Sequence, residues 1–362
     1  MNVQPRLSRL ASIDANRFLL CPRLDDIRWL TGFTGSTASL LVDRHRGVAH
    51  LFVDSRYVER ARHEIAVSNA QVEIHLVESG SSIAALIGDV VQQNSVIVDP
   101  QHITVAQFNS YQEKFSIHTE TSPCDELRRV KDENEIDLIA RAASIADEAL
   151  ASLLHDGLCG RTEREIAQHL DHLMRVGGAD DVGFDTIVAT GANAARPHHE
   201  PSNAVVEDGH CVIIDFGAEI DGYRSDMTRT IRVGSVSHEL ESMFEIVREA
   251  QQCGVDAVTN GVVGSRVDAA VRAVFAREGV EHEFIHGTGH GIGLYIHEPP
   301  ILSPRCEAVL QVNEVVTVEP GLYRKGVGGV RIEDQVVVTG TGCRILTLSP
   351  KELSCPRSPR TI

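Results

Sequence analysis

The sequence predicts an α/β unit followed by an α+β unit made of two related halves. In the first third of the chain, short apolar runs alternate with helical stretches, which is typical of an α/β layer with a largely parallel sheet. A polar, charged segment around residues 120–131, which contains Pro123, then interrupts this alternation. Beyond it, two helices followed by strands occur twice in succession, and this order indicates two related halves.

The first unit is expected to span residues 1–125. Its candidate strands are residues 17–20, 39–42, 50–53, 72–77 and 95–99. Its candidate helices are residues 56–66 and 82–93. We place the boundary after residue 125 because polar segments with proline are where domains commonly separate.

The second unit is expected to span residues 126–350. Its first helix, 134–154, is predicted by apolar residues that recur at three- and four-residue steps, namely Ile136, Ile139, Ala143, Ala146, Leu150 and Leu153. A second helix is expected to begin at the capping-box pattern Thr162-x-x-Glu165 and to end near Val176, before two glycines. Further helices are expected at 239–258 and 265–278. The Pro- and Ser-rich segment after Ser349 is expected to fray, and residues 351–362 are assigned to a tail.

Composition and charge exclude several classes of function. The 362 residues are 42% hydrophobic and carry 51 Asp and Glu against 34 Lys and Arg, for a formal charge of -17. This balance argues against nucleic acid or an anionic membrane as the main partner. No apolar run approaches the roughly 20 residues that span a bilayer, and the N-terminus lacks the apolar region of a secretory signal. The eight cysteines form no C-x-x-C pair, which suits reduced thiols, so a cytoplasmic protein is expected.

The first chemical signal is CVIIDFGAEIDGYRSDMTRT, residues 211–230. Asp221-Gly222 is a favoured two-residue hairpin turn, because both positions of this turn need positive φ. Counting back from the turn pairs residue 217 with Asp226 and places Asp215 on the same face. Two carboxylates so close repel each other unless a cation lies between them. The alternative is a solvated polar face with an exposed Asp226.

The second signal is HEFIHGTGHGIGLYIHEPP, residues 282–300, in which His286, His290 and His297 lie within a glycine-rich loop. Alternating glycines allow the backbone to approach a ligand closely and to adopt conformations closed to other residues. A nucleotide-binding loop is disfavoured because the glycine spacing is not G-x-G-x-x-G. A single histidine would more often be a core or surface residue, but three in twelve positions favour a site.

The third signal is VVTVEPGLYRKGVGGVRIEDQVVV, residues 315–338. It is expected to form two strands, 315–319 and 329–338, with Glu319 at the end of the first and Glu333 in the middle of the second. A glutamate within a β-branched run costs desolvation unless a partner compensates it. Charges that protect an edge strand from aggregation are the alternative. Taken together, two Asp, one His and two Glu are a ligand set for two divalent ions, with manganese favoured and cobalt or zinc also suitable.

These motifs resemble, in order and spacing, those of the pita-bread metallopeptidases, the family of methionine aminopeptidase, prolidase and aminopeptidase P. The segments that carry the resemblance are DFGAEIDGYRSDMTRT, HGTGHGIGLYIHE, VEPGLY and GVRIED. By this resemblance the metal ligands are Asp215, Asp226, His290, Glu319 and Glu333. It also implies a pita-bread fold for the second unit.

The N-terminal unit and the histidines narrow the resemblance to the proline-specific branch. WLTGFTGSTASLLV and LFVDSRYVERA are similar to the N-terminal domain of creatinase, prolidase and aminopeptidase P. The resemblance assigns catalytic roles to His198, His286, His297 and Glu319, and substrate contacts to His198, His297, Tyr323 and Arg331. ANAARPHHEPS departs from the family pattern at Arg196, and His199 adjoins His198, so either imidazole is a candidate; the position in the motif favours His198.

The function implied is metal-dependent hydrolysis of the Xaa-Pro bond at the N-terminus of peptides, by a homodimer with two manganese ions. Proline-containing peptides are the expected partners, and no nucleic acid or membrane is expected. An Xaa-Pro dipeptidase (prolidase) is the nearest alternative. A creatinase-like C–N hydrolase and a non-catalytic binding module on the same fold are the others.

Overall fold

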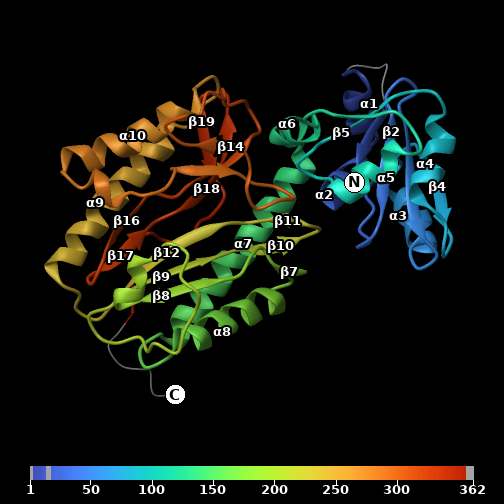
Figure 1. Cartoon of the computed structure of the whole chain (residues 1–362). Coiled ribbons are helices and arrows are strands. Elements are labelled where there is room, and N and C mark those ends of the chain that lie inside the picture. The colour runs from blue at the N-terminus through green and yellow to red at the C-terminus, as the bar shows by residue number, and fades with distance from the viewer. Residues whose placement is uncertain (1–2, 14–17, 356–362) are drawn as a thin grey trace. The chain divides into compact units, whose positions relative to one another are not determined.

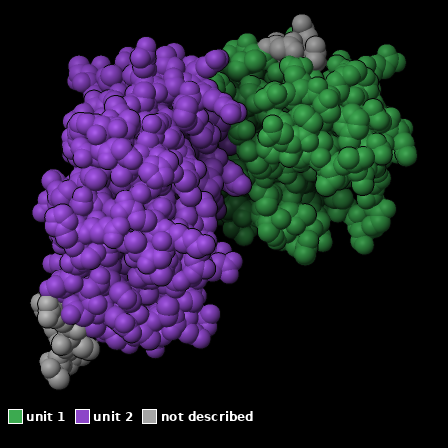
Figure 2. Space-filling view, turned by 60° about the vertical axis from the view of Figure 1, so that its left-hand side comes forward, with its two compact units in different colours: residues 1–127 green, residues 128–362 purple. Residues whose placement is uncertain are grey.

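The computed structural model describes residues 3–13 and 18–355. The chain forms two compact units, residues 1–127 and 128–362 (Figure 2). Among the helices of the described residues, none is long and apolar enough to cross a membrane.

The first unit is a six-stranded sheet with helices on its faces (Figure 1). The strands are β1 (Phe18–Cys21), β2 (Ser39–Asp43), β3 (Val48–Asp54), β4 (Val72–Val77), β5 (Val96–Val98) and β6 (Ile117–Thr119). The helices are α1 (Gln4–Ala11), α2 (Leu24–Thr31), α3 (Val58–Ser68), α4 (Ile83–Val91), α5 (Val105–Gln112) and α6 (Cys124–Arg129), the last reaching the second unit. All five expected strands and both expected helices are present, although residue 17, where the first strand was expected to begin, lies outside the described residues.

The sheet is mixed rather than largely parallel, which corrects the expectation. Its order is β4-β3-β2-β1-β5-β6, and β2 pairs antiparallel with both β1 and β3, whereas the other three pairs are parallel. The reason is a tight turn between β2 and β3, in which Gly47 has a φ of 66°. A short turn can join only antiparallel strands, whereas parallel strands need a long crossover.

The second unit contains two helix pairs and two main sheets. The helices are α7 (Glu133–Asp156), α8 (Glu163–Val176), α9 (His238–Ala257) and α10 (Gly264–Arg277), with short 3-10 helices η1 (Gly191–Ala195) and η2 (Glu281–Glu283). Figure 1 shows α9 and α10 at one side of the strands of this unit and α8, which packs with α7, at the opposite side. Thr162 caps α8 as expected, because its hydroxyl accepts from Glu165 N at 3.2 Å and the Glu165 carboxylate accepts from Thr162 N at 2.8 Å.

Each half of the unit contains one main sheet and one short ribbon, in agreement with two related halves, and β20 (Leu353–Cys355) from the C-terminal end of the chain joins the first sheet. The first sheet has the order β20-β12-β9-β8 and the second β14-β13-β15-β18-β19, while β11-β10-β7 and β16-β17 form the ribbons. The first-half strands are β7 (Asp181–Val182), β8 (Ile187–Thr190), β9 (Cys211–Phe216), β10 (Ala218–Ile220), β11 (Tyr223–Arg224) and β12 (Met227–Val233). The second-half strands are β13 (Gly289–Gly291), β14 (Glu298–Leu302), β15 (Val315–Val318), β16 (Gly321–Arg324), β17 (Gly328–Arg331), β18 (Asp334–Thr339) and β19 (Gly342–Ile345).

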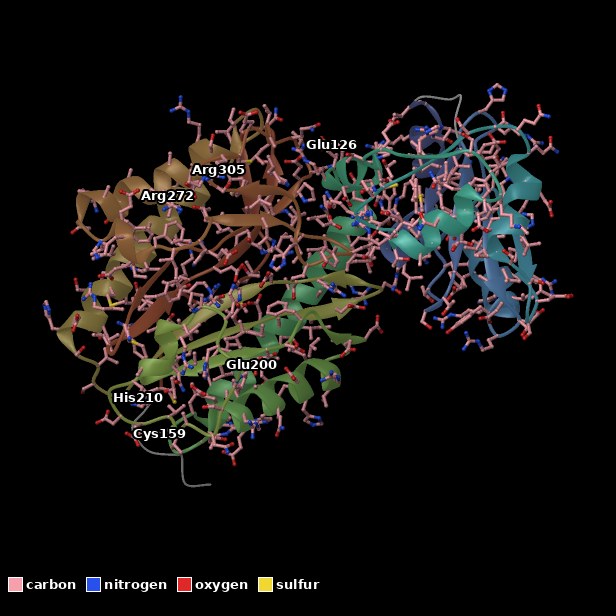
Figure 3. The ribbon with its side chains drawn as sticks, in the orientation of Figure 1. Glu126, Cys159, Glu200, His210, Arg272 and Arg305 are labelled. Atoms are coloured by element: carbon pink, nitrogen blue, oxygen red, sulfur yellow. The ribbon has the colours of Figure 1, made fainter. Side chains whose placement is uncertain are left out.

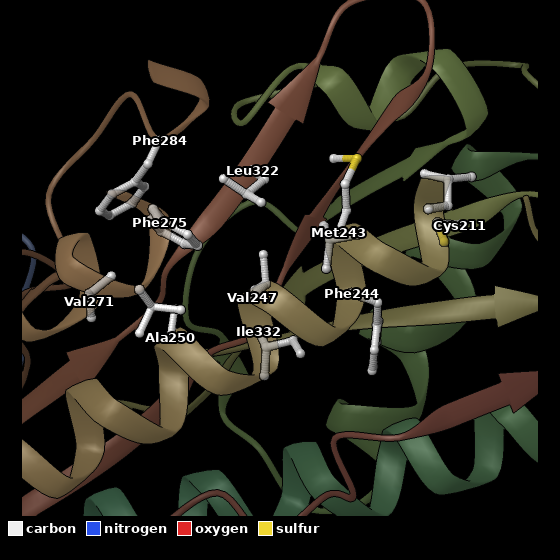
Figure 4. Packing of buried hydrophobic residues seen from close by; sticks show 13 residues of the cluster. Cys211, Met243, Phe244, Val247, Ala250, Val271, Phe275, Phe284, Leu322 and Ile332 are labelled. Atoms are coloured by element: carbon white, nitrogen blue, oxygen red, sulfur yellow. The ribbon is translucent and has the colours of Figure 1, made fainter. Parts of the chain in front are cut away.

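The core of the second half lies between α9, α10 and the strands. Figure 4 shows Phe244 and Val247 of α9, Phe275 of α10, Leu322 of β16 and Ile332, which directly follows β17, in one buried cluster. Burial of each such side chain contributes about 1.5–3 kcal/mol relative to leaving it in water. This packing holds the β16-β17 ribbon, which carries Tyr323 and Arg331.

Two expectations about the C-terminal strands are wrong. The run 329–338 is not one strand: β17 ends at Arg331, and β18 begins at Asp334 in a different sheet. The chain changes sheets because Glu333 N donates to Thr228 O of β12 at 3.1 Å. The tail does not fray from residue 351, because Leu353–Cys355 forms β20, which pairs with β12. The rest of the tail lies outside the described residues.

Candidate functional site

Four carboxylate side chains and one imidazole, each in or next to a different strand, meet in one cavity of about 290 Å³. Asp215 belongs to β9, and Asp226 directly precedes β12. His290 is the middle residue of β13, Glu319 directly follows β15, and Glu333 directly precedes β18. The two related halves thus each contribute ligand-type side chains to the same space.

The two aspartates reach this space through the hairpin that the sequence predicted. Asp221 and Gly222 have φ of 47° and 76°, as the turn requires, and residue 220 pairs with residue 223. The register continues beyond the ribbon, where residue 215 lies opposite residue 228. Asp215 Oδ2 accepts from Arg331 at 2.6 Å, but among the described residues no donor reaches its buried Oδ1. A buried oxygen without a donor is costly, so Asp215 has room for a cation.

The His290 imidazole is oriented for metal binding. Its Nδ1 lies 3.0 Å from the carbonyl oxygen of Gly291, so Nδ1 carries the hydrogen and donates it. Nε2 then presents its lone pair to the cavity, 3.5 Å from both Asp226 Oδ2 and Glu319 Oε1. Burial first, and then the neighbouring His297, lower the pKa of His290 to about 4. The ring is therefore neutral at physiological pH, which is the form that binds metals.

The carboxylates repel one another in the absence of a cation. Burial raises the pKa of Asp226 and of Glu333 well above their usual range, and neighbouring carboxylates raise both further. Burial likewise raises the pKa of Glu319 to about 8, although Arg331 opposes this shift. Ligand atoms of Asp226, His290 and Glu333 all lie within 4.8 Å of one another. This donor set fits divalent cations, which would relieve the repulsion.

The glycines of the histidine loop have a role different from the expected one. None of the glycines at 287, 289, 291 and 293 has a positive φ among the described residues. Instead, a Cβ at Gly289 would lie 1.9 Å from Thr317 O, and a Cβ at Gly291 would lie 2.2 Å from Pro299 O. These two glycines are thus required for close packing of β13 against its neighbouring strands. That packing brings His290 toward the carboxylates.

The two adjacent histidines of the 190–202 loop have separate environments. His198 is exposed and lines the cavity. His199 is buried and its Nε2 donates to Glu163 Oε2 at 2.8 Å. Glu163, at the first turn of α8, also accepts from Thr190 N at 2.7 Å and from Ser202 N at 2.9 Å. Glu163 therefore ties both ends of the loop that carries His198.

His286 and Tyr323 form a hydrogen-bonded chain with Arg331. Arg331 donates to the Tyr323 hydroxyl at 2.9 Å, and that hydroxyl lies 2.9 Å from His286 Nε2. His286 Nδ1 lies 2.8 Å from the carbonyl oxygen of Gly287, so both of its ring nitrogens are engaged. Burial first, and then Arg331, lower the pKa of His286 to about 4, so the ring is neutral. Tyr323 is buried behind the residues that line the cavity, whereas His286 and Arg331 belong to the lining.

The remaining walls of the cavity are one histidine and a group of apolar side chains. His297 lines the cavity, and its ring meets that of His290 edge to face, with centroids 4.4 Å apart. The apolar lining residues are Phe184, Ile187, Pro197, Ile296 and Ile301. A small apolar group next to the carboxylates would therefore find a matching wall.

Two supports of the site were missed by the sequence reasoning. The Thr228 hydroxyl donates to Glu333 Oε2 at 2.7 Å and accepts from Arg331 Nε at 3.0 Å. The hairpin register could have indicated Thr228, because it places residue 228 directly opposite Asp215. Arg272, which Figure 3 labels on α10, donates to the backbone oxygen of His286 at 2.8 Å. Its long side chain links α10 to the histidine loop, and no short-range pattern signals this contact.

Comparisons with known proteins agree with this architecture. The model of metallopeptidase family M24 matches residues 137–340, and that of the creatinase/prolidase N-terminal domain matches residues 8–130. An uncharacterized peptidase of Bacillus subtilis is 37% identical over 335 residues, which are 91% of this chain and 92% of that protein.

Solved structures share the fold over nearly the whole chain. An Xaa-Pro dipeptidase from Bacillus anthracis superposes with a TM-score of 0.92 at 36% identity, covering 98% of this chain and 100% of that one. An X-Pro aminopeptidase from Thermotoga maritima superposes with a TM-score of 0.86 at 32% identity, covering 96% of this chain and 99% of that one.

Proposed function

Because the chain belongs to metallopeptidase family M24, we propose that it hydrolyses the Xaa-Pro bond at the free N-terminus of peptides, as an Xaa-Pro aminopeptidase. It is a metallopeptidase that acts on Xaa-Pro bonds, with a creatinase-type N-terminal domain. The observation that carries the proposal is the convergence of four carboxylates and one neutral imidazole in a single cavity. The choice of aminopeptidase over dipeptidase is the finer part of the proposal.

Two divalent ions would be held by Asp215, Asp226, His290, Glu319 and Glu333. When bound, such ions polarise the scissile carbonyl and lower the pKa of a water molecule. The lone pair of His290 and the unpartnered oxygen of Asp215 support this assignment. We infer manganese as the metal because the set is rich in oxygen donors, with cobalt or zinc also compatible through the imidazole.

The chain's own side chains supply the proton transfer and the orientation of the substrate. Glu319 would take a proton from the attacking water and pass it to the leaving imide nitrogen of proline. His198 and His297 line the cavity and would orient the peptide and donate hydrogen bonds to the tetrahedral oxyanion. His286 would act mainly by fixing the Tyr323 hydroxyl, since both of its nitrogens are already engaged.

The preference for proline follows from the apolar wall and from the chemistry of the bond. Phe184, Ile187 and Ile301 offer apolar contact beside the carboxylates, and a pyrrolidine ring is a compact apolar group. The X-Pro amide has no N–H, so the cavity need supply no acceptor for that nitrogen. The acidic surroundings would attract the α-ammonium group of a free N-terminus.

We also infer that the enzyme is a cytoplasmic homodimer. The cytoplasmic location is supported by eight cysteines that are all free thiols. The dimer rests on the resemblance to the family.

The test is kcat/KM on Ala-Pro, Ala-Pro-Ala and a longer Xaa-Pro peptide with manganese. Comparable rates on all three are expected of the aminopeptidase, whereas activity confined to Ala-Pro would make the enzyme a dipeptidase. Replacement of proline by alanine in the same peptides should lower kcat/KM steeply. No cleavage of any of them by metal-loaded protein would remove the peptidase proposal.

A further inference from the structure

The first unit contains a second cluster of metal-ligand residues, which the proposed peptidase chemistry does not use. His50, Glu73 and His75 offer one ligand atom each, and the three atoms all lie within 4.8 Å of one another. The cluster belongs to β3 and to β4, the edge strand of the six-stranded sheet (Figure 1). We propose that His50, Glu73 and His75 form a binding site for a single zinc-type transition-metal ion.

The strand register explains why the three side chains meet. β3 and β4 pair in parallel with His50 opposite Glu73 and Phe52 opposite His75. Residues two apart on one strand point to the same face, so all three ligands project from one side of the sheet. The convergence is therefore fixed by backbone pairing and does not depend on long flexible side chains.

The distances suit one ion. His50 Nδ1 lies 3.0 Å from His75 Nε2 and 3.4 Å from Glu73 Oε2. Ligand bonds of about 2.0–2.1 Å place neighbouring donor atoms about 2.8–3.4 Å apart for angles between 90° and tetrahedral. His50 Nδ1 would thus be adjacent to both other ligands around the same centre.

The histidines are held in place, and their protonation suits a metal. His75 stacks on Phe52 with ring centroids 4.8 Å apart and an interplanar angle of 18°. His50 is buried, and it lies opposite Leu41 of β2. Burial lowers the pKa of both imidazoles, which favours the neutral form that binds metals.

Binding requires a change of tautomer in one of the two rings. In the absence of an ion, one imidazole donates its hydrogen to the other across the 3.0 Å contact. Each neutral ring can carry its single hydrogen on the other nitrogen instead, and both lone pairs then face the ion. Two nitrogens and one carboxylate oxygen suit zinc and similar borderline ions better than magnesium or calcium.

The site has an open side and would stabilise the edge of the sheet. The Glu73 side chain is 58% exposed, so water can complete the coordination. The negative charges of Glu73 and Asp43 raise the pKa of His50, whereas the positive charge of Arg46 lowers it. An ion bound here would cross-link the edge strand β4 to β3.

The test counts zinc bound by the full chain. Protein stripped with a chelator is dialysed against increasing concentrations of free zinc, and bound zinc per chain is measured by atomic absorption. The wild type should bind one ion per chain more than His75→Phe, which keeps a ring against Phe52 but removes the nitrogen. Glu73→Gln should weaken the binding of that ion at least tenfold. The substitution should leave the fold intact, because the Glu73 side chain is 58% exposed.

The matched control is His118→Ala, because His118 lies in β6 at the opposite edge of the same sheet. This control should bind as much zinc as the wild type. The comparison between variants cancels any ions held by the second unit, so the result is independent of the peptidase proposal. Equal zinc binding by wild type, His75→Phe and Glu73→Gln would overturn the inference and leave a hydrogen-bonded histidine pair only.

Discussion

Replacement of Glu163 by glutamine should both destabilise the protein and slow catalysis, although Glu163 touches neither substrate nor metal. Its carboxylate is fully buried and accepts five hydrogen bonds. Oε1 accepts from Thr190 N and Asn193 Nδ2, whereas Oε2 accepts from His199 Nε2 and from the backbone and hydroxyl of Ser202. These bonds close the loop that carries His198.

The magnitude follows from the number of donors that lose an acceptor. Glutamine has one carbonyl oxygen and one NH₂ group, so a donor replaces either Oε1 or Oε2 of the carboxylate. At least two of the five bonds are then lost, and each buried unsatisfied donor costs about 1–3 kcal/mol. We expect a loss of roughly 3 kcal/mol, which lowers Tm by roughly 6–12 °C at about 2–4 °C per kcal/mol for a unit of this size.

The effect on catalysis should be smaller than that of removing His198 itself. Loss of an oxyanion donor costs about 10²–10³ in kcat, and a displaced loop that still samples the active position should cost roughly tenfold. The assay is kcat and KM on Ala-Pro-Ala at a temperature where circular dichroism shows the variant folded. Metal content should be unchanged because no ligand is altered.

Glu165→Gln is the matched control on the same helix turn. Glu165 is exposed, and glutamine also fits the third position of a capping box, so stability and kcat should stay close to wild type. If the Glu163→Gln protein had the same Tm as this control, the claim that the hydrogen bonds of Glu163 stabilise the protein would be refuted. A lower Tm with unchanged kcat would refute the claim that the hydrogen bonds of Glu163 position His198 for catalysis.

Three further outcomes are expected. Asp226→Asn should lower bound metal below two ions per chain in elemental analysis of folded protein, and unchanged metal content would contradict the ligand assignment. His198→Ala should lower kcat by about 10²–10³ with metal retained, whereas His290→Ala should lose metal first; a silent His198→Ala with a damaging His199→Ala would reverse the choice between the neighbours. The pKa of Glu298 is held below 4.5, because the charges of Lys131 and Arg128 outweigh the effect of burial. The contribution of Glu298 to stability is therefore present above pH 4.5 and is lost as the pH falls through the lower folded pKa. Glu298→Gln should therefore melt lower than wild type at pH 7, with a gap that narrows in acid melts; a gap independent of pH would count against the ion pair.

The sequence alone was sufficient to predict the features that depend on residues close together in the chain. The Asp221-Gly222 turn fixed the register that places Asp215 and Asp226 on one face, because the turn geometry determines every pair that follows it. The capping box at Thr162 located the start of α8 for the same local reason. The family motifs gave the candidate ligands, and the structure brings all of them to one cavity.

Tertiary structure decided what depends on segments far apart in the chain. Apolar alternation indicated one strand through Glu333, but the chain changes sheets there because its backbone bonds to Thr228 of β12, about a hundred residues earlier. The position in the motif favoured His198 but left His199 as a candidate, whereas in the fold His199 bonds to Glu163 and His198 lines the cavity. A side chain finds its hydrogen-bond partner among whatever groups packing brings near it, and that choice is made in three dimensions.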